Sequence, residues 1–426
     1  MRLRTGFVVL VTFVLAATIG FGCTSGPAKR SASNSVTATT QHHEAVTPGK
    51  APRDRRAQFE QFLGEHTMLA VRYMRSVVTG PPELKDALGT SLQDNTEELS
   101  ELVGAAYGDD AGGRFEQLWK THITALGSYA DGVANHDEKA KQAARTALAA
   151  YSNAHGTWFA QASKGRVQAS VAAAGVRQHI DELMRQVDVY AAKNYGEAYR
   201  IQRVAYEHMF TAGATMAKGS VTPELAVGFD TPPEKLRSAF AMLLGEHMEL
   251  LVDAQRAAFA GPAEFKAAGA EVNANTTALT QAMGAILGPV KGAEFQTAWA
   301  NHVDGLMAYT SAVAGMNDVG KESAKRNLDA FANRLALYFS DVVNNQLPVE
   351  PLTQAVTMHD SHLINQVNAY AAKDYVKAQE MEDHGYHQML GVANTLVGAI
   401  QRTLKPGLPV GGSKTGGGGT AHQHSR

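Results

Sequence analysis

The chain is nearly free of cysteine, since Cys23 is the only one among 426 residues. An intramolecular disulfide is therefore impossible, and any site for a soft metal must be built from histidine and methionine. An excess of charge is also lacking, with 39 basic and 41 acidic residues and a net charge of −2. Proteins that bind nucleic acid carry a basic footprint, so we expect no nucleic-acid partner.

Signatures of catalysis are missing as well. The sequence has no Gly-x-Ser-x-Gly elbow, no P-loop, no dinucleotide-binding fingerprint and no His-Glu-x-x-His motif. A di-iron site would need paired glutamates with Glu-x-x-His on facing helices, and covalent haem would need Cys-x-x-Cys-His. Neither occurs as a repeated motif, so a role without catalysis is favoured and enzymatic activity is left open.

Long apolar runs are scarce, and the clearest one lies at the N-terminus. Arg2 and Arg4 precede an apolar stretch from Phe7 to Ile19, which ends at Gly22 and Cys23. The stretch is shorter than the roughly 20 residues of a membrane-spanning helix and is typical of an export signal. It resembles a bacterial lipoprotein signal, which implies a lipid on Cys23 and an anchor on the outer face of a membrane. A plain secretory signal is the alternative.

What the chain does contain is an internal repeat. The ten residues from Gln186 to Tyr195 return 180 positions later, from Gln366 to Tyr375, with seven identities. Such self-similarity indicates a duplicated structural unit. Further matches are Leu63-Gly64-Glu65-His66 with Leu244-Gly245-Glu246-His247, the Phe-x3-Trp-x2-His-x3-Leu-x2-Tyr pattern of 115–129 with that of 295–309, and His179 with His359.

The repeat and the composition of the connecting segments divide the chain. Segments rich in Gly, Pro, Ser and Thr bury no core and indicate tethers and linkers. The predicted parts are a signal segment at 1–23, a flexible tether at 24–54, a helical bundle at 55–218, a linker at 219–233, a second bundle at 234–403 and a glycine-rich disordered tail at 404–426.

The apolar residues of each copy recur at helical spacing, and no stretch alternates as a strand would. We therefore predict an all-α protein of two tandem, homologous bundles in which successive helices are antiparallel. In the first copy, Gly80-Pro81 ends the first helix and residues 108–113 end the second. The fourth helix is expected at about 137–163 and the sixth at about 196–217.

Three histidines recur at matching places on the apolar stripes of their helices, which predicts that they point into the bundle. Asn95 and Asn275 match on the stripe of the second helix. Bundle cores build metal and cofactor sites from facing helices. The candidate metal ligands are His66, His122 and His179 in the first copy and His247, His302 and His359 in the second.

Two interpretations of these histidines stay open. Each imidazole can be a structural core residue that makes a hydrogen bond, or it can bind a ligand. Imidazole suits copper, zinc, nickel and iron, and a thioether favours copper. Met209 matches Met389, so copper is the favoured ion, with zinc or non-covalent haem as alternatives. Metal binding should weaken as pH falls through about 6.5.

The second copy has additional histidines. His208 of the first copy becomes Gln388, whereas His362, His384 and His387 have no histidine counterpart. Spacing of three residues puts two imidazoles on one helical face, as in His359 with His362 and in His384 with His387. These residues are further candidate ligands, and the second copy is where we expect an additional or tighter site.

The combination of Gly-Glu-His, an aromatic residue followed by His, and Tyr-Ala-Ala-x-x-Tyr resembles a group of exported bacterial proteins. Some of its members are named copper amine oxidase-like through an attached domain that is not visible here. The resemblance implies metal association, but no amine oxidase reaction, because the sequence shows no quinone-forming motif. The favoured function is an exported, lipid-anchored metal-binding protein. The alternative is a cell-envelope interaction or structural module with a protein partner and purely structural histidines.

Overall fold

The computed structural model describes residues 52–404, and within that range it consists of helices joined by short connections, without a strand. The prediction of an all-α fold is therefore confirmed. The signal segment with Cys23, most of the tether and the tail from residue 405 lie outside the described residues. None of the described helices is long and apolar enough to cross a membrane.

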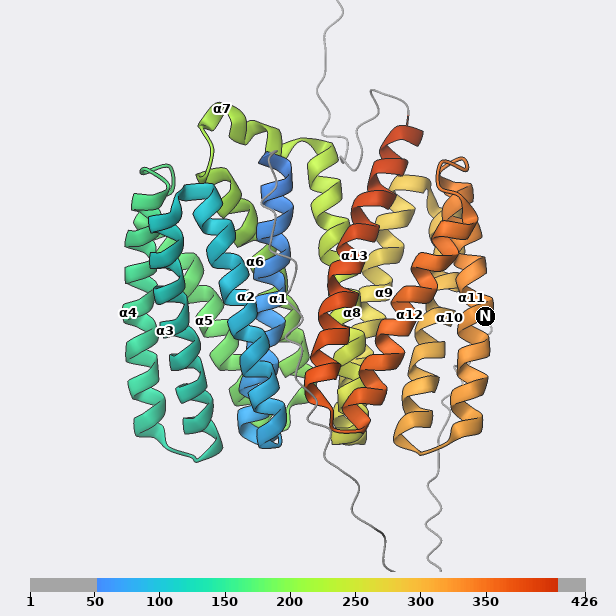
Figure 1. The fold of residues 1–426 in the computed structure, drawn as a ribbon, viewed down its shortest axis with the longest axis horizontal. Coiled ribbons are helices and arrows are strands. Elements are labelled where there is room, and N and C mark those ends of the chain that lie inside the picture. The colour runs from blue at the N-terminus through green and yellow to red at the C-terminus, as the bar shows by residue number, and fades with distance from the viewer. Residues whose placement is uncertain (1–51, 405–426) are drawn as a thin grey trace, which may run out of the picture. The chain divides into compact units, whose positions relative to one another are not determined.

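Six helices form the first half and six form the second, with a short connection between them (Figure 1). The first half contains α1 (Pro52–Thr79), α2 (Pro82–Tyr107), α3 (Asp109–Ala134), α4 (Glu138–Ala162), α5 (Ala169–Ala191) and α6 (Tyr195–Gly219). The connection contains α7 (Pro223–Ala226) and the 3₁₀ turn η1 (Val227–Asp230). The second half contains α8 (Pro232–Ala260), α9 (Pro262–Leu287), α10 (Pro289–Ala314), α11 (Asp318–Val342), α12 (Val349–Ala371) and α13 (Tyr375–Thr403).

Four of the six pairs of equivalent helices agree in length. Both α2 and α9 have 26 residues, as do α3 and α10, whereas α4 and α11 have 25 and α5 and α12 have 23. The turns agree too, because Lys193 and Lys373 adopt left-handed φ angles of 60° and 62° after α5 and α12. This agreement is what the predicted duplication requires.

The predicted break at residues 108–113 is too wide. Only Gly108, with φ of 104°, lies between the helices, and α3 starts at Asp109. Gly112 is inside α3 because two helices approach closely there: a Cβ on it would lie 2.8 Å from the carbonyl oxygen of Ser100. The predicted linker is also partly helical, since α6 extends to Gly219 and α7 and η1 follow.

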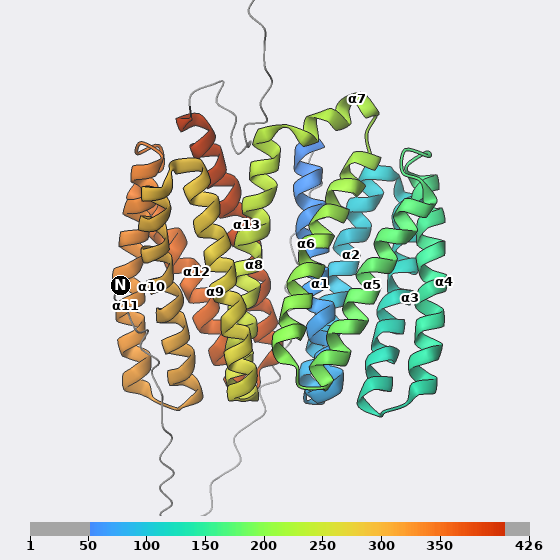
Figure 2. The same ribbon diagram turned by 180° about the vertical axis from the view of Figure 1, so that it is seen from behind.

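Successive helices lie side by side and run in opposite directions within each half (Figures 1 and 2). The apolar stripes of the helices meet in a core of each half. The core of the second half continues into the first, because Met68, Tyr206 and Phe210 pack within it. The two halves therefore belong to one compact unit.

A buried ionic network also joins the halves. Arg72 of α1 places Nε 2.7 Å from Asp253 Oδ1 and Nη1 2.5 Å from Glu249 Oε2, and it also contacts Glu382. Arg256 pairs with the same Glu382 at 2.5 Å. Burial, opposed by Arg72, raises the pKa of Glu249 to about 8, so this carboxyl is largely protonated at neutral pH. Two arginines then face two carboxylates.

Equivalent residues meet directly at the contact between the halves. The hydroxyls of Tyr206 and Tyr386 lie 3.0 Å apart, and these residues are 180 positions apart in the chain. Each ring occupies the space beside a glycine of the opposite half. A Cβ on Gly64 would lie 2.8 Å from the Tyr386 hydroxyl, and one on Gly245 would lie 2.5 Å from the Tyr206 hydroxyl. This contact explains the glycine in both copies of Leu-Gly-Glu-His.

We predict that Arg72→Met lowers the free energy of unfolding by about 3–5 kcal/mol, because it leaves buried carboxylates without their partner. Urea denaturation at neutral pH measures the change. Arg185→Met is the control, since Arg185 forms an exposed ion pair with Glu197 and such pairs contribute about 0–1 kcal/mol. Equal losses in the two variants would show that the network contributes nothing.

Candidate metal centres

The three repeated histidines of each half come together in its core. In the first half α1, α3 and α5 supply His66, His122 and His179, whose ligand atoms all lie within 4.8 Å of one another. In the second half α8, α10 and α12 supply His247, His302 and His359 in the same way. All six side chains are buried, as their places on the apolar stripes predict. We call these groups the first and second triads.

Aromatic residues fix the imidazoles of the first triad. The Nε2 atoms of His66 and His122 are 3.2 Å apart. The His122 ring stacks on Tyr151 with centroids 4.8 Å apart, and Trp119 lies 4.7 Å from the ring of His66. Aromatic contacts on several sides leave these rings little freedom to rotate.

Aromatic residues surround the second triad in a similar way. Its ring centroids are 5.4 to 5.7 Å apart. His302 stacks on Phe331 at 5.2 Å, where the first triad uses Tyr151, and Trp299 lies 4.6 Å from His247. The two triads are therefore built alike from equivalent helices.

Most of the imidazole nitrogens lack a hydrogen-bond partner within the protein. Both ring nitrogens of His179, His247 and His359 are buried without one, as is Nδ1 of His66. An unpaired buried polar group costs about 1–3 kcal/mol. A set of such groups aimed at one point is expected where a ligand completes the site.

Burial also sets the charge of the triads. It lowers the pKa of His122 and of His302 to about 3. Burial, together with the neighbouring histidines, lowers the pKa of His66 and His247 well below the ordinary value. Neutral imidazole is the form that binds a metal ion, so both triads are in the ligating state at neutral pH.

A fourth imidazole lies beside the first triad and was not predicted. His155 of α4 is buried, has no partner for either nitrogen, and its ring lies 6.2 Å from that of Trp119. Burial lowers its pKa to about 4. Its equivalent in the second half is Leu335, so a comparison of the two copies passes over it. Its place on the buried face of α4, four residues after Tyr151, was the available signal.

A carboxyl group lies behind the second triad and was also not predicted. Asp360 Oδ1 is 3.2 Å from His302 Nδ1, without the angle of a hydrogen bond. Burial raises the pKa of Asp360 well above its usual value, so the group is a neutral acid in the absence of a cation. The first half has Ile180 at the equivalent position. Carboxyl groups next to ligating histidines orient the ring and tune the metal.

The structure gives Asn95 and Asn275 partners outside the triads. The Asn95 amide donates to the Phe62 carbonyl oxygen at 3.0 Å and to Glu65 Oε2 at 3.1 Å. Asn275 donates likewise to Leu243 and to Glu246. These amides therefore position the glutamate that precedes a triad histidine, and they are not among the converging imidazole nitrogens.

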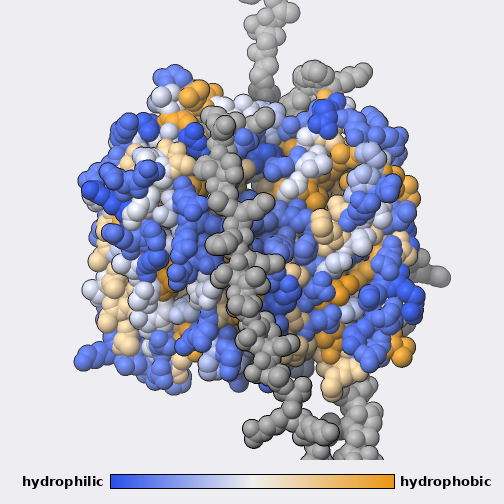
Figure 3. Space-filling view, viewed as in Figure 1, coloured by the Kyte–Doolittle hydropathy of each residue, from blue (hydrophilic) through white to orange (hydrophobic). Residues whose placement is uncertain are grey.

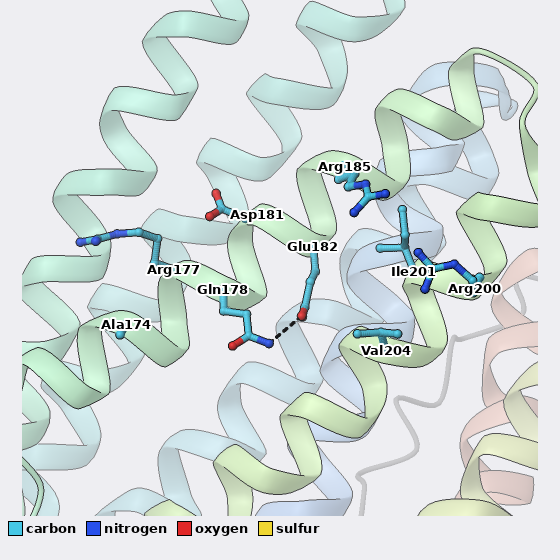
Figure 4. Close-up of a pocket in the computed structure, with 9 residues that line it drawn as sticks. All are labelled: Ala174, Arg177, Gln178, Asp181, Glu182, Arg185, Arg200, Ile201 and Val204. Carbon is cyan, nitrogen blue, oxygen red and sulfur yellow. Dashed lines mark hydrogen bonds between the residues drawn. The ribbon is translucent and has the colours of Figure 1, made fainter.

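His208 is paired at the edge of the first half. Its Nδ1 lies 3.1 Å from Glu182 Oε2. Figure 4 shows Glu182 in a groove between α5 and α6, where it accepts a hydrogen bond from Gln178 at 2.9 Å. The equivalent Gln388 donates to the Ala355 carbonyl oxygen at 2.8 Å. Neither side chain is among the convergent ligand atoms.

The predicted histidine pairs of the second half are divided among three places. His359 belongs to the triad, whereas His362 faces His384 with ring centroids 6.0 Å apart. His387 lies between the halves, with Nε2 3.5 Å from Glu65 and 3.4 Å from Asp383. Burial alone would lower its pKa, but the carboxylates of Glu65 and Asp383 outweigh burial and raise it to about 10. His387 is therefore a protonated partner of carboxylates.

The two methionines are buried in their cores. Met209 packs within the first half, and Met389 packs within the second, where it lines the same cavity as His302 and His359. Met389 therefore shares the wall of this cavity with two histidines of the second triad.

We predict that His155→Leu makes the metal-free protein less sensitive to acid. Because the folded pKa is about 4 and the unfolded one about 6.5, stability falls as pH drops between these values. The variant does not have this loss. The difference in unfolding free energy between variant and parent should therefore shift by about 2 kcal/mol in favour of the variant when the pH is lowered from ~7 to ~5. Urea titrations at the two pH values measure it, and parallel changes in both proteins would contradict it.

Comparisons with protein families, with curated proteins and with solved structures gave no match for this chain.

Proposed function

We propose that the protein is a metal-binding protein that holds one ion in each triad, with copper as the favoured metal. The observation that carries the proposal is the convergence of three buried, neutral imidazoles with unpartnered nitrogens, once in each half. The alternative of structural histidines would give each nitrogen a hydrogen-bond partner. The nitrogens of His179, His247 and His359 have none.

The charge of the triads supports a copper ion. The first triad offers neutral ligands alone, and burying a cation without a counter-charge is costly. Monovalent copper carries the smallest charge among the metals that imidazole suits. The second triad can accommodate a divalent ion more easily, because the proton of Asp360 can leave when a cation binds. Three nitrogens within 4.8 Å suit a single ion better than a haem.

Burial lowers the pH at which protons would displace a metal ion from the triads. An ordinary histidine site would release metal as pH falls through about 6.5. Since burial lowers the pKa of His122 and His302 to about 3, protons compete for these nitrogens only in more acidic solution. Retention of metal in mildly acidic surroundings is consistent with a protein outside the cytoplasm.

We further propose that a lipid on Cys23 tethers the protein to the outer face of a bacterial membrane. The support is the N-terminal sequence, in which Arg2 and Arg4 precede an apolar stretch that ends at Gly22 and Cys23. Cys23→Ala should therefore move the protein from the membrane fraction to the soluble or culture fraction. An equal share of membrane-bound protein in the variant would refute the anchor.

We predict that tag-free, full-length protein binds two equivalents of Cu(I), and that His122→Leu and His302→Leu each bind one. Each substitution removes one nitrogen from a different triad and leaves an apolar side chain in an apolar surrounding. Competitive titration against a copper chelator measures the stoichiometry, and melting curves verify folding. His136→Asn is the matched control, because His136 is exposed and has a left-handed φ of 54° that asparagine tolerates.

Absence of binding in the parent would end the proposal and favour structural histidines. So would two equivalents in both triad variants, since the ions would then lie elsewhere.

A further inference from the structure

An apolar cavity of about 420 Å³ leads from the surface of the second half to the second triad. His302 and His359 lie on its wall together with Trp299 and Met389. Side chains of α12 and α13 form much of the remaining wall: Leu352, Ala355, Val356, Val392 and Leu396. Figure 3 shows hydrophobic residues gathered over α12 and α13 on an otherwise largely hydrophilic face.

We propose that this cavity binds a small, uncharged apolar molecule that carries one nitrogen head group of the azole type, with that head at the second triad. The volume lies in the range of about 300–1,000 Å³ that small-molecule sites occupy. The proposal deepens the proposed function, and only its metal-ligating form rests on that function.

The apolar wall of the cavity determines the chemical character of most of the ligand. Nearly all of its wall is apolar side chain, and a charged group buried there would lack a partner. Among the residues that line the cavity, His302 and His359 are the titratable ones, and no acidic or basic side chain accompanies them. The ligand is therefore apolar and uncharged along most of its length.

The unpartnered nitrogens select the head group. Both nitrogens of His359 are buried without a hydrogen-bond partner on the wall of this cavity. An N–H group can donate to such a nitrogen in the metal-free protein, which removes the cost of an unpaired acceptor. A neutral azole nitrogen can also ligate an ion held by the triad. One head group thus fits the site in both states.

The first half fills the equivalent region differently. Leu335 on the cavity wall corresponds to His155, whose ring packs 5.2 Å from that of Trp158. Tyr338 stands in place of Trp158, and its hydroxyl donates to the carbonyl oxygen of Lys291 at 3.0 Å. The tilted rings of His155 and Trp158 in the first half are therefore replaced in the second half by Leu335 and by a hydrogen-bonded Tyr338. We accordingly assign the ligand site to the second half.

Calorimetric titration of full-length, metal-free protein with 4-phenylimidazole tests the proposal. The expected result is one equivalent bound, with at least a tenfold loss of affinity in Ala355→Trp, whose indole would occupy the cavity. The matched control is Gly175→Trp at the equivalent position of α5, where a Cβ meets nothing within 4 Å. Far-ultraviolet circular dichroism and melting curves establish that both variants fold. If Ala355→Trp does not fold, Val392→Phe from α13 replaces it.

Absence of 4-phenylimidazole binding to the metal-free and the Cu(I)-loaded parent would overturn the proposal. Binding that survives the cavity-filling variant, or that is lost equally in Gly175→Trp, would overturn it as well. The Cu(I) stoichiometry of the parent reports separately on the metal centre. If the parent binds one equivalent of 4-phenylimidazole but binds no Cu(I), the cavity proposal is upheld and the proposed metal-binding function is refuted.

Discussion

Three consecutive residues of α1 connect the contact between the halves to the first triad. Gly64 makes room for Tyr386 of the opposite half. Glu65 accepts the Asn95 amide and pairs with His387, and His66 lies in the triad. Because an α-helix rotates by about 100° per residue, the three residues face three different neighbours. Displacement of α1 would disturb the interface and the imidazoles together.

The three equivalent residues of α8 are Gly245, Glu246 and His247. They show where the two halves differ although their arrangement is similar. Gly245 lies beside Tyr206 and His247 lies in the second triad. Glu246, however, accepts hydrogen bonds from Nε and Nη2 of Arg203, at 2.9 and 3.0 Å. The equivalent position of the other half holds Asp383, and there the positive charge comes from His387. The glutamate beside the triad histidine therefore pairs with a positive group in both halves, but with a different residue in each.

The triads have diverged less than their surroundings. His155 adds a fourth imidazole to the first, whereas Asp360 and an open cavity distinguish the second. These differences predict unlike properties for the two sites. The first is enclosed by aromatic rings and offers neutral imidazoles only. The second has an acid that can lose its proton and a path to the surface.

Much of the fold and the core of the site could be predicted from the sequence. Helical periodicity gives the all-α fold, and the position of His66, His122 and His179 on apolar stripes places them inside. Comparison of the two copies selects these residues because it finds what both retain. For the same reason it passes over His155 and Asp360, which occur in one copy each.

Other features depend on contacts that no local pattern contains. Arg72 meets Asp253, which is 181 positions away in the chain, and neither residue carries a motif. The cavity beside the second triad arises from differences in size, such as Leu335 in place of His155, whose effect depends on how the helices pack. His387 shares a helical face with His384, yet its partner Glu65 comes from the other half.

X-ray absorption spectroscopy of the metal-loaded protein tests the central claim most directly, because it reports the atoms bound to the ion. The account predicts a first shell dominated by imidazole nitrogens, about three per ion, at about 2.0–2.1 Å when zinc is the bound metal. A shell of oxygen atoms alone, as from carboxylates and water, would contradict it, since the ion would then lie outside both triads.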